Sequence, residues 1–154
     1  MNALLTAIVI WLAANFDLPV NYEHPSVEHV PSTPMAALRY RGLASDHAPV
    51  PDPRNDAQPL DPGSNVVALY DPKRNVIYLP DGWSGRTPAE LSVLVHEMAH
   101  HLQNQAGLKF DCPGAQEKVA YAAQAQWLAL FGKTLEDEFE IDGLSLLVRT
   151  NCLG

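Results

Sequence analysis

The chain has 154 residues, of which 47% are hydrophobic and 18% are charged, so a disordered chain is excluded and one globular domain is expected. Ten Lys and Arg residues against eighteen Asp and Glu residues give a net charge of −8. A nucleic acid or an anionic membrane would therefore find no basic surface to bind. No apolar run reaches the roughly 18 residues of a membrane-spanning helix. The oligomeric state stays open.

An apolar run over residues 3–14 has the length of the hydrophobic region of a secretory signal peptide, with a passable cleavage site after Ala14. Its start lacks the usual basic residues, because no Lys or Arg precedes Arg39. The alternative is an N-terminal helix packed in the core. We expect residues 1–14 to be a signal peptide, residues 15–154 to form a single domain, and the protein to be extracytoplasmic, either periplasmic or secreted.

The two cysteines, Cys112 and Cys152, are compatible with one disulfide in an exported protein. The bridge would join the start of one C-terminal helix to the end of the chain. Two buried thiols or a pair of metal ligands are the alternatives, although no C-x-x-C spacing supports ligation. We expect the disulfide.

Proline dominates the first half of the chain, since twelve of the thirteen prolines lie between residues 19 and 88. Such density forbids long helices and favours extended segments and turns. We expect strands at Val66–Tyr70 and Val76–Leu79, joined by a turn-rich connection of hairpin length. A short helix is expected over residues 34–41, and a surface loop over residues 45–64.

The first helix of the second half is expected to run from Pro88 to about Gln105. Thr87 and Glu90 form a capping box at its start, and Gly107 provides a stop signal. Apolar residues recur at spacings of three and four, which predicts the core-facing stripe Leu91, Leu94, Val95, Met98 and Leu102.

Two further helices complete the second half. One should run from about Gly114 to Phe131 and end at Gly132. The other should start behind Thr134 and continue towards Arg149, with a bend at Gly143. The expected fold class is α+β, with a short antiparallel hairpin sheet followed by three helices.

The motif His96-Glu97-x-x-His100 lies on the first of these helices. Two histidines at i and i+4 share one side of a helix, so their imidazoles can bind one Zn²⁺. Glu97 points roughly 100° away around the helix, which places its carboxylate beside the metal as a general base. The alternative is a histidine pair without metal and a solvated Glu.

A catalytic zinc needs a third protein ligand and one open position. The metzincin extension fails, because Gln103 and Ala106 stand where Gly and His are required. Asp111 is nearer to the motif, but no helix fixes it. Glu117 faces the histidine pair if the second helix folds back on the first, and Tyr121, Gln124 and Leu128 then line the same side. We expect Glu117 as the ligand, with Asp111 as the main rival; a Glu favoured by the helix dipole is the alternative interpretation.

The five-residue pattern that starts at His96, followed on the next helix by Glu117-x-x-Ala120, resembles the gluzincins, zinc metallopeptidases with two His and one Glu as ligands. The likeness is to small single-domain members and covers roughly residues 66–131. It implies a zincin-like domain, in which a short β-sheet precedes the active-site helix. An edge strand, here Val76–Leu79, would receive an extended peptide.

One departure from the thermolysin-like gluzincins concerns the orientation of a ligand histidine. Those members place an Asp four residues after the Glu ligand for this purpose, whereas this chain has Tyr121. Another carboxylate, such as Asp142, is then the candidate for that role.

The mechanism follows from these roles. Zinc would lower the pKa of a bound water towards about 7 and polarise the scissile carbonyl, and Glu97 would move the water proton to the leaving amine. Tyr121 and His101 are candidate donors to the oxyanion. A Tyr packed between helices is the alternative for Tyr121, and His101 is expected to point off the metal face.

We therefore expect a small exported zinc-dependent peptidase that acts on a peptide or protein substrate. The alternative is a catalytically silent zinc-containing binding or structural domain, since a fold does not guarantee activity.

Overall fold

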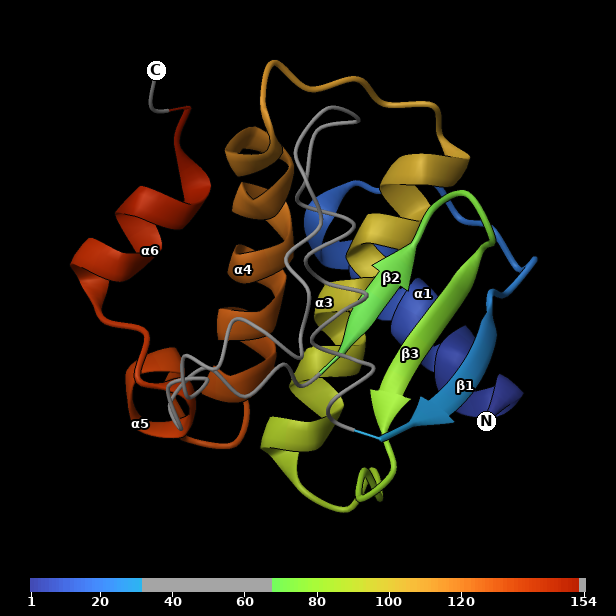
Figure 1. The fold of residues 1–154 in the computed structure, drawn as a ribbon, viewed down its shortest axis with the longest axis horizontal. Coiled ribbons are helices and arrows are strands. Elements are labelled where there is room, and N and C mark those ends of the chain that lie inside the picture. Colours follow the sequence, from blue (N-terminus) through green and yellow to red (C-terminus); the bar gives the residue numbers. More distant parts are fainter. Residues whose placement is uncertain (32–67, 153–154) are drawn as a thin grey trace, which may run out of the picture. The chain divides into compact units, whose positions relative to one another are not determined.

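The computed structural model describes residues 1–31 and 68–152, and it divides the chain into two compact units. One unit joins residues 1–25 to residues 84–154, and the other comprises residues 26–83. The fold class is α+β, as expected (Figure 1). The elements are α1 (Asn2–Phe16), β1 (Ser26–Val30), β2 (Leu69–Asp71), β3 (Val76–Pro80), α3 (Pro88–Gln105), α4 (Pro113–Ala129), α5 (Leu135–Phe139) and α6 (Gly143–Thr150).

Some predictions fall on segments that the structure leaves undescribed. The helix expected over residues 34–41 and the loop expected over residues 45–64 lie outside the described residues, as does the start of the first predicted strand. Within the described ranges, no helix is long and apolar enough to cross a membrane.

The smaller unit contains a three-stranded mixed sheet in the order β1-β3-β2 (Figure 1). The antiparallel pairing of β2 with β3 agrees with the predicted hairpin, in register from Leu69 opposite Tyr78 to Asp71 opposite Val76. The expectation of a purely antiparallel sheet was wrong, because β1 pairs with β3 in parallel. The expectation that Val76–Leu79 is an edge strand open to a peptide was also wrong, because β3 lies between β1 and β2 and pairs with both. Pro25 and Pro31 flank β1 and leave its own backbone N–H groups free to join the ladder.

Helix α3 is the central helix of the larger unit, and its bounds match the prediction. The Thr87 hydroxyl accepts a hydrogen bond from the Glu90 backbone N–H at 3.1 Å. The Glu90 carboxylate accepts from the backbone N–H groups of Ser84 and Gly85, which lowers the pKa of Glu90. Beyond the helix, Gly107 adopts φ +67°, a conformation that favours glycine. The residues from 92 to 103 are all buried, so α3 is covered on every side.

Helix α1 packs in the larger unit, beside α3 and α4. Its buried residues are Leu5, Ile8, Val9 and Leu12. Trp11 meets Trp127 of α4 edge to face, with ring centroids 5.4 Å apart. In the described structure, residues 2–16 therefore form part of a helical core. Cleavage of residues 1–14 as a signal peptide stays a prediction.

The single helix expected from Thr134 towards Arg149 was wrong, because the structure has two helices there. Helix α5 ends at Phe139, and the next residue, Glu140, has a φ of +56°, in the left-handed region. Helix α6 then starts behind Asp142, whose side chain accepts a hydrogen bond from the Ser145 N–H at 2.7 Å. The C-terminal half therefore contains four helices instead of three.

The predicted disulfide between Cys112 and Cys152 is confirmed. It joins the residue before α4 to the segment after α6, and the two helices also approach closely at that end. A β-carbon added at Gly114 would overlap the backbone carbonyl of Asn151. The end of α6 is thus held against the first turn of α4 by a covalent bond and by backbone packing.

Candidate metal centre

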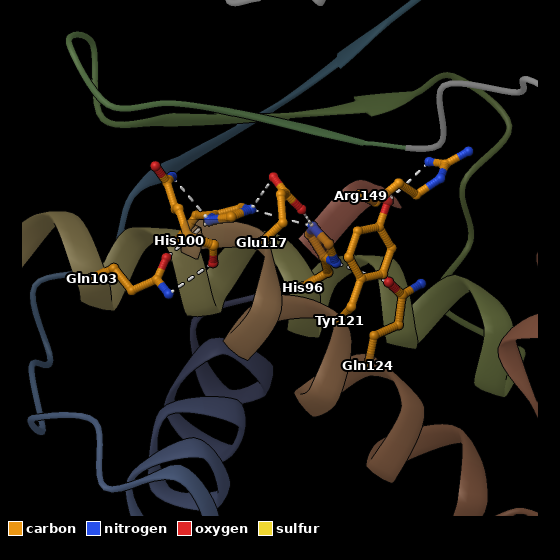
Figure 2. Close-up of polar contacts among 8 residues, drawn as sticks. His96, His100, Gln103, Glu117, Tyr121, Gln124 and Arg149 are labelled. Carbon is orange, nitrogen blue, oxygen red and sulfur yellow. Dashed lines mark hydrogen bonds and ion pairs between the residues drawn. The ribbon is translucent and has the colours of Figure 1, made fainter. Parts of the chain in front are cut away.

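Helix α4 runs back alongside α3, as the metal-ligand prediction requires (Figure 1). Helix α3 supplies His96 and His100, one turn apart, and α4 supplies Glu117. Both histidines are buried, at 8% and 6% exposure. The Glu117 carboxylate lies between the two imidazole rings (Figure 2).

The three side chains place their ligand atoms within hydrogen-bond distance of one another. Glu117 Oε2 lies 2.9 Å from His96 Nε2, and Glu117 Oε1 lies 3.0 Å from His100 Nε2. The two Nε2 atoms are 3.2 Å apart. This group could hold a metal ion. The rival ligand Asp111 is exposed and is not part of the group.

The proton position on His96 is set by Gln124 of α4. The Gln124 amide nitrogen donates to Ser92 Oγ at 3.3 Å, while Ser92 donates to the Ala89 carbonyl at 2.7 Å. The Gln124 oxygen therefore faces the ring, 2.9 Å from His96 Nδ1, and accepts its proton. Nε2 of His96 then faces the Glu117 carboxylate (Figure 2).

His100 is oriented by Gln103, one turn further along α3. The Gln103 amide nitrogen donates to the Gln116 backbone carbonyl at 3.2 Å, so its oxygen accepts from His100 Nδ1 at 3.0 Å. The side-chain amide of Gln116 lies 3.1 Å from the same Nδ1. In both imidazoles, Nδ1 therefore contacts a glutamine side-chain amide and Nε2 contacts the Glu117 carboxylate.

These contacts favour a cation at the shared centre. A neutral His96 with its proton on Nδ1 presents a lone pair 2.9 Å from a carboxylate oxygen. Two acceptors at that distance repel each other unless a positive charge lies between them. A metal ion would receive lone pairs from both histidines and from Glu117. The donor set and its orientation thus fit a divalent metal.

Without a metal, a proton supplies the positive charge. Burial lowers the pKa of His100, but the hydrogen bond to Glu117 and the negative charges of Glu117 and Glu97 outweigh burial and raise the pKa to about 9. Burial acts to raise the pKa of Glu117, but the hydrogen bond from His100 and the close imidazole of His96 hold it well below its ordinary range. At neutral pH the metal-free centre therefore contains an ion pair.

Glu97 is buried, at 9% exposure. Its charge acts on His100, as the raised pKa of that histidine indicates. Its carboxylate therefore contributes to the negative field around the histidine pair. The catalytic role expected of Glu97 stays a prediction.

Tyr121 packs its ring against His96, with centroids 4.6 Å apart and an angle of 75° between the planes. Its hydroxyl accepts a hydrogen bond from Arg149 Nη1 of α6 at 3.1 Å (Figure 2). Tyr121 thus lies between the candidate centre and a cation from the last turn of α6. The position agrees with the side of α4 expected for Tyr121, and its role as an oxyanion donor stays a prediction.

One secondary expectation needs correction. Asp142 does not orient a ligand histidine, because its carboxylate caps α6; Gln124 occupies that place beside His96. His101 is fully buried and its Nε2 donates to the Glu23 carbonyl at 2.9 Å, in agreement with the expectation that it points off the metal face. Burial lowers the pKa of His101.

Sequence reasoning missed two residues at this site. Gln103 belongs to the polar run Gln103-Asn104-Gln105 at the end of α3, a composition typical of a solvated helix end, yet it is 2% exposed. Its position three residues after His100 is the signal that could have placed it beside the ring. Arg149 was missed because it reaches Tyr121 from α6, and the sequence gives no local signal for that contact.

The family model described as "Domain of unknown function (DUF6647)" matches residues 51–153. The chain belongs to this family. The match covers most of the chain and contains the three side chains of the candidate metal centre and both cysteines. Among curated proteins and solved structures, no match to this DUF6647 member was found.

Proposed function

We propose that this DUF6647 member is a zinc-dependent peptidase of gluzincin type with a zincin-like domain. The observation that carries the proposal is the convergence of three side chains: Glu117 Oε2 lies 2.9 Å from His96 Nε2, Glu117 Oε1 lies 3.0 Å from His100 Nε2, and the two Nε2 atoms are 3.2 Å apart. Two ligands at about 2.0–2.2 Å from a tetrahedral zinc are about 3.3–3.6 Å apart. The metal-free separations are therefore slightly below those of a zinc site, and a small outward movement would admit the ion.

Two features of the donor set favour zinc over other divalent metals. Two imidazole nitrogens and one carboxylate are the ligands of many catalytic zinc sites, whereas magnesium and calcium prefer oxygen ligands alone. Among the described residues, the candidate group contains three protein ligands and no fourth. Three ligands leave one position for a substrate or a solvent molecule.

Zinc, when bound, would supply a Lewis acid that polarises the scissile carbonyl and acidifies water. Glu97 would accept the water proton and deliver it to the leaving amine. Its burial beside His100 suits this task, because a carboxylate in a partly dry site transfers protons more readily than a solvated one. Tyr121 would donate its hydroxyl proton to the developing oxyanion, and Arg149 would hold that hydroxyl in position.

We further propose that the protein works outside the cytoplasm. The disulfide between Cys112 and Cys152 supports this, because such bonds persist in oxidising compartments.

Peptide-library profiling and metal analysis test the proposed function together. The zinc-loaded protein should contain about one zinc per chain and should cleave peptides, and a chelator should stop the cleavage. Glu97→Gln should keep the zinc but lower kcat/KM by roughly 10²- to 10⁴-fold. Glu136→Gln, which removes one exposed carboxylate from α5, is the charge-matched control. If the zinc-loaded wild type leaves a broad library uncut, the silent zinc-binding domain is the correct alternative.

A further inference from the structure

We infer that Arg149 binds a substrate carboxylate beside the metal centre, so that the preferred substrate is a peptide with a carboxylate close to the cleaved bond. This inference rests on the proposed peptidase function and adds its substrate class. Arg149 belongs to α6, and a single aromatic ring, that of Tyr121, separates its guanidinium from His96 (Figure 2).

The guanidinium has donors available for such a ligand. Its Nη1 donates to the Tyr121 hydroxyl at 3.1 Å, which uses one of five N–H groups. Within the described ranges, no carboxylate lies within ion-pair distance of Arg149. The residue is also exposed to solvent. A planar guanidinium with open N–H groups matches the two oxygens of a carboxylate.

The overall charge of the protein makes a local cation necessary for such a substrate. The chain has a net charge of −8, to which the carboxylates of Glu97 and Glu117 at the candidate centre contribute; a bound zinc would offset these two charges but not those of the rest of the chain. These charges would repel an anionic peptide. Arg149 offsets this repulsion at one point, beside the metal centre, and so favours a carboxylate there.

The fold holds Arg149 in place from both sides along the chain. Before it, Leu146 packs in a cluster with Tyr121, Leu128 and Leu135. After it, Asn151 meets Gly114 and Cys152 forms the disulfide with Cys112. A short helix of eight residues would fray at its end without such restraints. The backbone of Arg149 is therefore held in place, and the hydrogen bond to the Tyr121 hydroxyl orients its guanidinium, which favours recognition of a carboxylate.

Binding to zinc-loaded Glu97→Gln tests the inference without hydrolysis. Three peptides of the same core sequence are compared by fluorescence anisotropy: a neutral peptide with an amidated C-terminus, the same peptide with a free C-terminal carboxylate, and the amidated peptide with one Glu side chain. One or both carboxylate peptides should bind roughly 10- to 100-fold tighter than the neutral peptide. The peptide that shows the gain identifies whether the carboxylate is terminal or from a side chain.

Variants of Arg149 assign the effect to this residue. Arg149→Gln in the same background should remove the preference, and Arg149→Lys should keep part of it, because lysine retains the charge but not the planar fork. Lys133→Gln removes a positive charge beyond the far end of α4 and should leave the preference intact. Equal loss of affinity for all three peptides in Arg149→Gln would mean that Arg149 only ties α6 to Tyr121, and the inference would be overturned. Equal binding of all three peptides by the parent protein would overturn it as well.

The same peptides separate the inference from the proposed function. If the zinc-loaded wild type cleaves the neutral peptide and the carboxylate peptides with equal kcat/KM, the peptidase proposal stands and the role of Arg149 fails. If it cleaves none of them, and none of a broad library, the peptidase proposal fails. Zinc content and circular dichroism of each variant show that it is folded and loaded.

Discussion

Gln124 Oε1 lies 2.9 Å from His96 Nδ1, and this contact decides which nitrogen of His96 faces the candidate metal. Gln124 is 4% exposed, and its amide is anchored on Ser92. Under the proposed gluzincin interpretation, a neutral amide stands where thermolysin-like gluzincins use a carboxylate to orient a ligand histidine. An amide fixes the tautomer without adding negative charge, so the metal would retain more of its positive charge.

Replacement of Gln124 should weaken metal binding. Gln124→Leu removes the acceptor of the His96 Nδ1 proton, and we expect a roughly 10- to 100-fold loss of zinc affinity, measured by competition with a chromophoric chelator. Gln124→Glu restores an acceptor and should recover the affinity. Gln126→Leu, an exposed position on the same helix, is the control. Equal affinities for Gln124→Leu and the wild type would contradict the assigned tautomer.

Zinc uptake by the metal-free protein should release protons. The pKa of His100 is raised to about 9 in the metal-free centre, so this imidazole is protonated at pH 7 and must lose its proton to bind zinc. We expect between about one and two protons per zinc at pH 7, from His100 and in part from a zinc-bound water, and a decline towards about one above pH 9, where His100 is neutral. Calorimetry in buffers of different ionisation enthalpy measures the number. A value near zero at pH 7 would show that His100 is neutral in the metal-free centre.

The metal-free protein should also be most stable in mildly acidic solution. The raised pKa of His100 contributes stability that is complete below its ordinary value of 6.5 and is lost as the pH rises through about 9. The lowered pKa of Glu117 contributes stability that is complete above its ordinary value of 4.5 and is lost as the pH falls below it. Urea unfolding at several pH values should therefore show a maximum in the free energy of unfolding between the two ordinary pKa values, 4.5 and 6.5. Glu117→Gln should make this pH dependence flatter.

Gly114→Ala should destabilise the protein. The added methyl group would overlap the backbone carbonyl of Asn151, and neither backbone can move far because of the adjacent disulfide. Overpacking of this kind costs roughly 1–3 kcal/mol in the free energy of unfolding, which thermal denaturation can measure. Gly143→Ala is the matched control, since a β-carbon there meets nothing within 4 Å. A lower melting temperature for the control than for Gly114→Ala would contradict this account of the α4–α6 contact.

Local periodicity explains why much of the site could be predicted from the sequence. His96 and His100 share a side of α3 because they are four residues apart, and the bounds of α3 follow from Thr87, Pro88 and Gly107. Glu117 required one further assumption, that α4 folds back on α3, and the short connection between the helices makes that arrangement natural.

The parts that could not be predicted depend on contacts between distant segments. Strand β1 pairs in parallel with β3 across more than forty residues, and nothing in the sequence of β1 specifies that partner. The break between α5 and α6 depends on a left-handed Glu140, a conformation that a non-glycine residue seldom adopts. Gln103 is buried because α4 packs over it. The polar residues at the end of α3 indicate a solvated helix end, and only the contact with α4 reverses that interpretation.

The disulfide between Cys112 and Cys152 and the centre formed by His96, His100 and Glu117 join successive helix pairs, α4 with α6 and α3 with α4. A reductant would open the first link, and a chelator would open the second in the zinc-loaded protein proposed above. Each reagent should release a different segment to amide hydrogen exchange: the end of α6 after reduction, and the facing turns of α3 and α4 after chelation. The stability of α6 is therefore expected to depend on the redox state of the surroundings, and the stability of the α3–α4 contact on the supply of metal.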